Sequence, residues 1–312
     1  MDQGKYHMFY SRWRTNNHSF GDGWLFGSEI AHAVADSPGG PFTPTGVVLG
    51  RRMNDVRLAY WDSQTQHNPH VRKFGGRFYL YYMASVDPGT NAWPDVDQRN
   101  RIQRNQRIGV VVADSIPDLV DGKFKRPDAP ILSPVYSTNA DADRRINPVD
   151  FAANRMVNNP SVIQRPDAKF QLIYKSNWPQ PPRYGHGTAL ADNPAGPFTL
   201  LPGPILSDHG REDENHWFDA VRRRYFLVCK NFGPGGIEQM ESVDSTNWVS
   251  SGIQFGKVIR WADGVSEPVD ALERPQLLLN TDGQPMMLYM AARRVLANGG
   301  VESFNVHIPL GR

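Results

Sequence analysis

The chain has 312 residues, a net charge of +2, 39% hydrophobic and 11% aromatic residues, 28 glycines, 25 prolines and one cysteine. This length allows a sizeable core, no run approaches the roughly 18 apolar residues of a membrane helix, and the near-neutral charge gives no indication of nucleic-acid binding. Cys229 cannot form an internal disulfide and is interpreted as a small core residue. The many glycines and prolines favour short strands joined by turns.

Hairpin patterns of one kind recur along the chain. Each has a polar head, a strand, a short turn and an aromatic strand whose side chains alternate with period 2. The four copies begin at His67, Asn158, Glu212 and Glu273. Three turns carry Gly or Asp, where we expect the positive φ that a tight hairpin needs: Gly75-Gly76, Pro166-Asp167-Ala168 and Asp282-Gly283.

A second pattern follows each hairpin. It is a strand that ends in Asp-Ser or Asp-Asn and a Pro/Gly turn, as in "SEIAHAVADSPGGPFT" and "YGHGTALADNPAGPFT". The copies cover residues 28–43, 106–124 and 184–199, with weaker ones at 237–248 and 301–310. Five copies of this pattern imply five repeated units.

The repeats predict an all-β fold, a five-bladed β-propeller in one domain. Units of about 55 to 90 residues with about four short strands each are typical of propellers, and helical signals are weak throughout. A β-sandwich is the alternative, but it does not predict repeated pairs of motifs. The expected blades cover residues 1–60, 61–135, 136–207, 208–265 and 266–312.

The first blade differs from the others. The segment 5–13, "KYHMFYSRW", aligns with the aromatic strand at 77–85, "RFYLYYMAS", so the counterpart of Pro69 would precede Met1. We therefore expect blade one to lack its innermost strand, through truncation or because another segment fills that place. The alternative is a blade that simply has no such strand.

The polar heads are expected to gather, because the innermost strands of a propeller line its axis. Proline tolerates the first strand position and holds the preceding residue extended, so Asn68 and Asn159 are predicted to be extended. The heads are His67-Asn68, Asn158-Asn159, Glu212-Asp213-Glu214 and Glu273-Arg274.

Two heads carry carboxylates, and a pair of carboxyl groups at a sugar-sized spacing is what glycosidic cleavage needs. One group protonates the leaving oxygen, and the other activates water or attacks the anomeric carbon. Aromatic side chains near the heads would stack on sugar faces, although a core position is the alternative for each: Tyr60, Trp61, Trp178, Tyr184 and Trp217.

The alternation of "HNPHV…GRFYLYY" with "AHAVADSPGGPF" and "GTALADNPAGPF" resembles the five-bladed β-propeller glycoside hydrolases. The resemblance spans nearly the whole chain and is greatest to the group around families 43 and 117, related to families 32, 62 and 68. It implies an axial funnel with an Asp base or nucleophile from blade one, a second Asp that orients and tunes, and a Glu acid from a later blade.

Only some of the residues that the resemblance implies have counterparts in this chain. The blade-one Asp would fall in the strand that this chain is expected to lack, His67-Asn68-Pro69 stands where family 43 often has Asp-Pro, and Asn159-Pro160 stands where it has its Glu. We therefore seek the acid in blade four or five. The candidates are Glu212 or Glu214 in blade four and Glu273 in blade five. "REDENHW" resembles an E-D-P-x-x-W head of relatives, which makes Glu212 the preferred acid and Asp213 its tuner. A solvated acidic turn and a pocket-fixing Glu273-Arg274 ion pair are the alternatives.

Histidines also lie at expected rim positions. The resemblance to family 117 makes His209 a candidate proton donor or sugar ligand. No H-x-x-x-H pattern or cysteine cluster indicates a zinc site, and no cofactor is expected to be required, although relatives can hold a cation such as calcium at the axis. The expected substrate-binding residues are His67, Asn68, Asn159, His186, His209, Trp217 and Arg274.

Three functions remain open at this stage. The first is a glycoside hydrolase that releases a terminal sugar from a plant or algal oligo- or polysaccharide. The second is a glycoside phosphorylase, for which Arg274, Lys230 and Arg183 could converge on phosphate. The third is a non-catalytic carbohydrate-binding propeller. The expected partner is a carbohydrate, with no nucleic acid or membrane, and the oligomeric state is open. The start of the sequence has no signal-peptide pattern, and an extracellular or periplasmic location is expected only from the polymeric substrates of such relatives.

Overall fold

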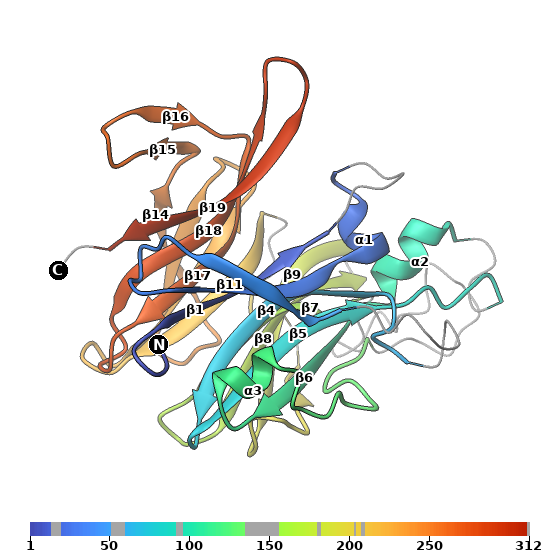
Figure 1. The fold of residues 1–312 in the computed structure, drawn as a ribbon. Coiled ribbons are helices and arrows are strands. Elements are labelled where there is room, and N and C mark those ends of the chain that lie inside the picture. Colours follow the sequence, from blue (N-terminus) through green and yellow to red (C-terminus); the bar gives the residue numbers. More distant parts are fainter. Residues whose placement is uncertain are drawn as a thin grey trace. The chain divides into compact units, whose positions relative to one another are not determined.

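The computed structural model describes residues 1–13, 20–50, 60–91, 96–134, 156–179, 182–202, 204–206 and 210–310. It divides into two compact units, Met1–Pro204 and Ile205–Arg312 (Figure 1). Within the described ranges, no helix has the length and apolar character needed to cross a membrane.

In its described residues, the first unit contains three antiparallel sheets and three short helices. Its sheets have the orders β1-β2-β3, β4-β5-β6 and β10-β9-β8-β7. The strands are β1 (Tyr6–Arg12), β2 (Glu29–Ala35), β3 (Thr43–Leu49), β4 (Thr65–Phe74), β5 (Arg77–Ser85), β6 (Arg107–Ala113), β7 (Asn158–Gln164), β8 (Phe170–Pro179), β9 (Pro182–Ala191) and β10 (Thr199–Leu200). The helices are α1 (Gly23–Gly27), α2 (Gln98–Arg104) and α3 (Ile116–Val120).

The second unit contains two larger antiparallel sheets and a separate two-stranded hairpin. The sheet orders are β11-β12-β13-β14 and β17-β18-β19, and β15 pairs with β16. The strands are β11 (Arg211–Asp219), β12 (Arg224–Asn231), β13 (Ile237–Ser242), β14 (Val249–Phe255), β15 (Val258–Arg260), β16 (Ser266–Pro268), β17 (Ala271–Leu279), β18 (Pro285–Val295) and β19 (Val301–Pro309).

The predicted repeats correspond to these strands. The four hairpins are β4–β5, β7–β8, β11–β12 and β17–β18, and the second motif supplies β2, β6, β9, β13 and β19. The all-β class and the small antiparallel sheets are therefore confirmed. The hairpin β15–β16 was not anticipated, and the blade boundaries and the absent innermost strand of blade one stay predictions.

The hairpin turns show one local difference from the prediction. Gly75, Gly76 and Gly283 have positive φ as expected, but in the β7–β8 turn the left-handed residue is Ala168, at φ 66°, and not Asp167. Asp167 serves the turn in another way, because its carboxylate accepts a hydrogen bond of 3.2 Å from the Lys169 amide.

Strand β5 shows what the alternating side chains of an aromatic strand contact on its two faces. Nearly every residue of β5 is buried, because the strand faces one core on each side. Tyr79 and Tyr81 belong to the core shared with β7–β9, whereas Leu80 and Tyr82 belong to the core shared with β2 and β3. Burial of each large apolar side chain stabilises the folded state by about 1.5–3 kcal/mol. Because β5 buries side chains on both of its faces, it is a central stabilising element of the first unit.

A pair of histidines in the first sheet makes the stability of this unit depend on pH. The Nδ1 atom of His7 lies 3.0 Å from Nε2 of His32, and Nδ1 of His32 lies 2.6 Å from the Thr45 hydroxyl. His32 is only 3% exposed, and burial, followed by the charge of His7, lowers its pKa to about 4. Burial also lowers the pKa of His7.

The sign of this dependence follows from proton binding. The unfolded chain binds a proton at His32 near the ordinary histidine pKa of 6.5 and the folded chain only near 4, so stability falls as pH falls through this window. We expect His32 to account for a loss of about 2 kcal/mol after solvent screening is allowed for. Urea unfolding at pH 7 and pH 4.5 should show a smaller acid-induced loss in His32→Gln than in the wild type. Equal losses in the two proteins would refute this assignment.

Candidate active site

Each of the four hairpins is interrupted at its polar head by a β-bulge. On β4, three steps from His67 to His70 face two steps on β5, and the same irregularity recurs at the other heads, between Asn158 and Ser161, Glu212 and Asn215, and Glu273 and Gln276. The second residue of every head adopts the left-handed conformation, with φ values of 53° to 64°: Asn68, Asn159, Asp213 and Arg274.

The bulges correct the prediction for Asn68 and Asn159, which was an extended backbone. A following proline disfavours the right-handed helical region, but the left-handed region remains accessible, and Asn tolerates it better than most residues. The extra residue bends the strand and re-aims the side chains of the head. The structure therefore positions the head side chains with a repeated bulge.

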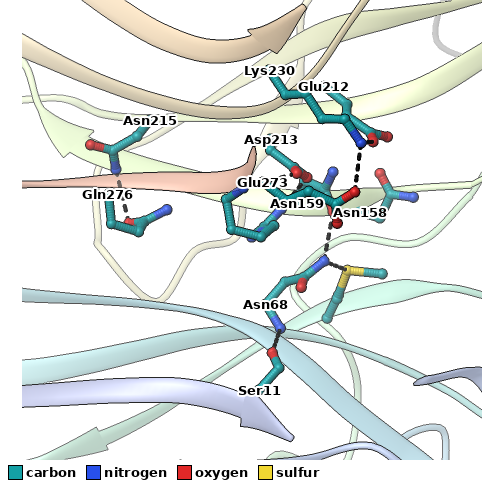
Figure 2. A network of polar contacts seen from close by, with 12 residues as sticks. Ser11, Asn68, Asn158, Asn159, Glu212, Asp213, Asn215, Lys230, Glu273 and Gln276 are labelled. Atoms are coloured by element: carbon teal, nitrogen blue, oxygen red, sulfur yellow. Dashed lines mark hydrogen bonds and ion pairs between the residues drawn. The ribbon is translucent and has the colours of Figure 1, made fainter. Parts of the chain in front are cut away.

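The heads of the second unit form a compact carboxylate cluster. Glu212 faces Lys230 across the β11–β12 pair. The Lys230 ammonium lies 3.1 Å from Glu212 Oε1 and 2.7 Å from Glu273 Oε1, so it bridges two strands (Figure 2). Burial acts to lower the pKa of Lys230, but Glu212, Glu273 and Asp213 outweigh it and raise that pKa. Glu273 is the open end of this cluster, since 45% of its side chain is exposed against 18% for Glu212.

Asp213 holds the backbone next to Glu273. Its Oδ2 atom accepts a 3.1 Å hydrogen bond from the backbone N–H of Arg274, and its Oδ1 accepts one of 2.8 Å from the Arg274 guanidinium. The Asp213 side chain is 6% exposed. A bulky residue such as Arg rarely adopts positive φ, so these two contacts stabilise the bulge from which Glu273 projects.

The residues that end two of the bulges, His70 and Asn215, connect neighbouring sheets within a unit. Asn215, which is 1% exposed, accepts a 3.2 Å hydrogen bond from the Leu277 amide and donates one of 3.0 Å to Gln276 Oε1. In the first unit, His70 occupies the same position, and its Nε2 lies 3.0 Å from the amide nitrogen of Val162. These contacts fix one head against the next.

The heads of the first unit contact one another through amides. Asn68 donates 2.8 Å hydrogen bonds from its backbone to Ser11 Oγ and from its side chain to Asn159 Oδ1. The ring of His67 is 3% exposed, lies 2.9 Å from Ser28 Oγ through Nδ1 and packs edge-on against Trp24. Asn158 donates to Gln106 Oε1 at 2.9 Å. These mostly buried groups form an amide-rich hydrogen-bond network.

Several predicted ligand residues lie in cores. Trp217 is 4% exposed and stacks on Phe226 with a centroid distance of 5.4 Å, and Trp61 stacks on Tyr82. Both tryptophans therefore occupy core positions, which was the alternative to sugar stacking stated for each of them. His186 and His216 are fully buried, whereas Tyr60 is 37% exposed. His209 and the side chains of Trp178, Arg183 and Tyr184 lie outside the described residues.

One exposed aromatic residue beside the cluster was not anticipated from the sequence. Phe232 is 51% exposed, and its ring centroid lies 4.4 Å from Lys230 Nζ. Its sequence position carried a usable signal, because Phe232 follows Lys230 by two residues at the end of β12 and so faces the same side. Among the residues that the structure describes, no group of three or more His, Cys, Asp or Glu side chains could hold a metal ion.

Comparisons with known proteins bear on the fold. No protein-family model matches the chain, and no curated protein matches it. Solved structures match it over nearly its full length. One is Zg3597, a family 117 glycoside hydrolase of the marine bacterium Zobellia galactanivorans, with 18% identity, 98% of this chain and 81% of that chain covered, and a TM-score of 0.63.

Two further structures extend the comparison. A GH43_1 enzyme from Xanthomonas citri shares 16% identity, with 99% of this chain and 85% of that chain covered and a TM-score of 0.58. BT0996, solved as an RGII complex, shares 15% identity, with 100% of this chain and 86% of that protein covered and a TM-score of 0.62. The chain thus has the fold of the family 43 and family 117 glycoside hydrolases, and the predicted structural resemblance is confirmed.

Proposed function

We propose that the protein is a glycoside hydrolase that removes a terminal sugar from a plant or algal oligo- or polysaccharide by carboxylate acid/base catalysis. The observation that carries this proposal is the cluster of Glu212 and Glu273 around Lys230, on a fold shared with glycoside hydrolases. The catalytic residues that we propose are Glu212 and Glu273, with Asp213 as the residue that orients Glu273.

The cluster can supply the proton that the leaving oxygen needs. Glu212 and Glu273 both bond the Lys230 ammonium, and a carboxyl group in its protonated form is the donor that this step requires. Glu273 has the exposure required to reach a bound glycoside.

The distance between the carboxyl groups of Glu212 and Glu273 limits the reactions that these two residues can catalyse without a third group. Because Glu212 and Glu273 bond the same Nζ at 3.1 and 2.7 Å, the bonded oxygens lie within about 6 Å of each other, below the roughly 6.5–9.5 Å of an inverting acid–base pair. This spacing includes the roughly 5–5.5 Å of a retaining acid and nucleophile, and we propose that the pair supplies the proton donor. An inverting reaction would need its base from outside this cluster.

The charges of the cluster favour hydrolysis over phosphorolysis. The phosphorylase alternative needs cations for phosphate, but Lys230 is bonded to Glu212 and Glu273, and Arg274 is bonded to Asp213. Both cations are therefore already bonded to carboxyl groups, so a phosphate would have to compete with these ion pairs for them.

We therefore expect turnover to be independent of inorganic phosphate. The assay is sugar release from a panel of plant and algal oligosaccharides, with and without added phosphate, and with mass analysis of the product. Free sugar at equal rates is the expected result. Formation of a sugar phosphate would establish the phosphorylase alternative, and binding of the oligosaccharides without any product would establish a non-catalytic protein.

A further inference from the structure

Phe232 is an exposed aromatic ring placed directly beside the carboxylate cluster. It follows β12 at the position where side chains share a face with Lys230, and Lys230 in turn faces Glu212. The Lys230 ammonium contacts the Phe232 ring at 4.4 Å while it bridges Glu212 and Glu273. The Phe232 ring and the carboxyl groups of Glu212 and Glu273 therefore all contact the Lys230 ammonium.

The backbone around Phe232 is held in place, which makes the exposure of the ring a defined feature. The Phe232 amide donates to the Gly210 carbonyl at 2.7 Å, and the Asn231 amide donates to the Gly236 carbonyl at 2.9 Å. The side chain of Asn231 accepts from the Gly233 amide at 2.9 Å and donates to Glu238 at 2.6 Å.

Gly236 closes the segment that follows the ring. It has φ 111°, and a Cβ at this position would lie 2.2 Å from the Phe255 carbonyl oxygen. A side chain at this position would therefore clash with the Phe255 backbone, so the observed turn requires glycine. Phe232 is thus a half-exposed ring on a fixed backbone, with charged groups on one side.

We propose, on the basis of the proposed function, that Phe232 is the platform on which the apolar C–H face of a sugar ring packs next to Glu212 and Glu273. Sites for uncharged ligands combine aromatic surface with a few convergent polar groups, and a rigid aromatic ring supplies contact area at little entropic cost. The three carboxyl groups of the cluster further specify a sugar ring without carboxylate or sulfate groups.

The test compares Phe232→Ala and Phe232→Trp with the wild-type chain. If the ring binds sugar in the ground state and the transition state alike, Phe232→Ala raises KM about tenfold and leaves kcat within about twofold, whereas Phe232→Trp retains the wild-type KM. The control is Val249→Ala, since Val249 is an exposed apolar residue of β14 with 65% exposure and should leave both parameters unchanged. An unchanged KM in Phe232→Ala would overturn the proposal.

A binding measurement separates this inference from the proposed function. Calorimetric titration uses galactotriose, xylotriose and arabinotriose as neutral probes and trigalacturonate as the acidic probe. We expect at least one neutral probe to bind, at least tenfold tighter than trigalacturonate, and to lose about tenfold in affinity in Phe232→Ala. This result without any turnover would support the platform while refuting catalysis. Turnover with equal affinity in Phe232→Ala and the wild type would refute the platform while leaving catalysis intact, and absence of binding by every neutral probe would refute the platform.

Discussion

Glu273→Gln and Glu212→Gln are each expected to lower kcat for oligosaccharide hydrolysis by about 100- to 10,000-fold, the range that a positioned general acid contributes. Glutamine keeps the shape and the hydrogen-bonding oxygen of glutamate but cannot supply the proton. Both residues bond Lys230, so each variant also replaces one of the two carboxyl groups that contact its ammonium with a neutral amide. Initial rates at saturating substrate give the comparison.

The choice of leaving group identifies the proton donor. An aryl glycoside with an acidic phenol needs little protonation of its leaving oxygen, so the variant that lacks the donor should recover most of its loss on such a substrate. A matched control is Glu241→Gln, because Glu241 is a half-exposed carboxylate of β13, 3.8 Å from Arg224. If Glu212→Gln and Glu273→Gln both keep the wild-type rate while Glu241→Gln does the same, the acid assignment is wrong.

Asp213→Ala is expected to lower the free energy of unfolding by about 2–4 kcal/mol, because it leaves a largely buried guanidinium and a backbone N–H without their acceptor. The Arg274 side chain is 19% exposed, so water replaces part of what is lost. Asp213→Asn, which keeps an acceptor for the Arg274 amide, should lose about half as much. Urea unfolding followed by circular dichroism measures both changes.

A double-mutant cycle isolates the contact between Asp213 and Arg274. Combining Asp213→Ala with Arg274→Ala should reveal a coupling free energy of about 1–3 kcal/mol. Additive effects of the two substitutions would show that the ion pair does not stabilise the bulge. In activity assays, Asp213→Asn should lower kcat more than it changes KM, because Asp213 acts through the position of Glu273.

Repeated local patterns made most of the strands predictable. Period-2 alternation and turn residues such as Gly75-Gly76 depend on neighbours in sequence, and the corresponding strands β4 and β5 formed where they were expected. The two-sided burial of β5 depends on packing between sheets, so the sequence could not distinguish its two cores from one.

The bulges were harder to predict because each depends on both strands of a hairpin. A proline after Asn68 or Asn159 indicates only that the right-handed helical region is disfavoured. The occurrence of Asn, Asn and Asp at the second position of three heads was a usable signal for positive φ, but Arg274 gave none. Its conformation depends on Asp213, a residue distant in sequence.

Side-chain partners in the candidate site were the least predictable feature. Lys230 was considered as a phosphate ligand, yet it bridges two carboxylates from different sheets. Trp217 follows the head at Glu212–Glu214 by three residues and Phe232 follows Lys230 by two, but Trp217 is 4% and Phe232 is 51% exposed. Exposure is decided by the packing of whole sheets, which the local pattern does not encode.

The central claim is that the protein cleaves a glycosidic bond with water, and one isotope experiment tests it most directly. The wild-type chain is incubated with the oligosaccharide panel in ¹⁸O-labelled water, and the released sugars are analysed by mass spectrometry. Incorporation of one ¹⁸O atom at the anomeric carbon of the released sugar, with the yield falling at least 100-fold in Glu273→Gln, is the predicted result. Absence of any labelled sugar across the panel, or the same yield from Glu273→Gln as from the wild type, would contradict the account.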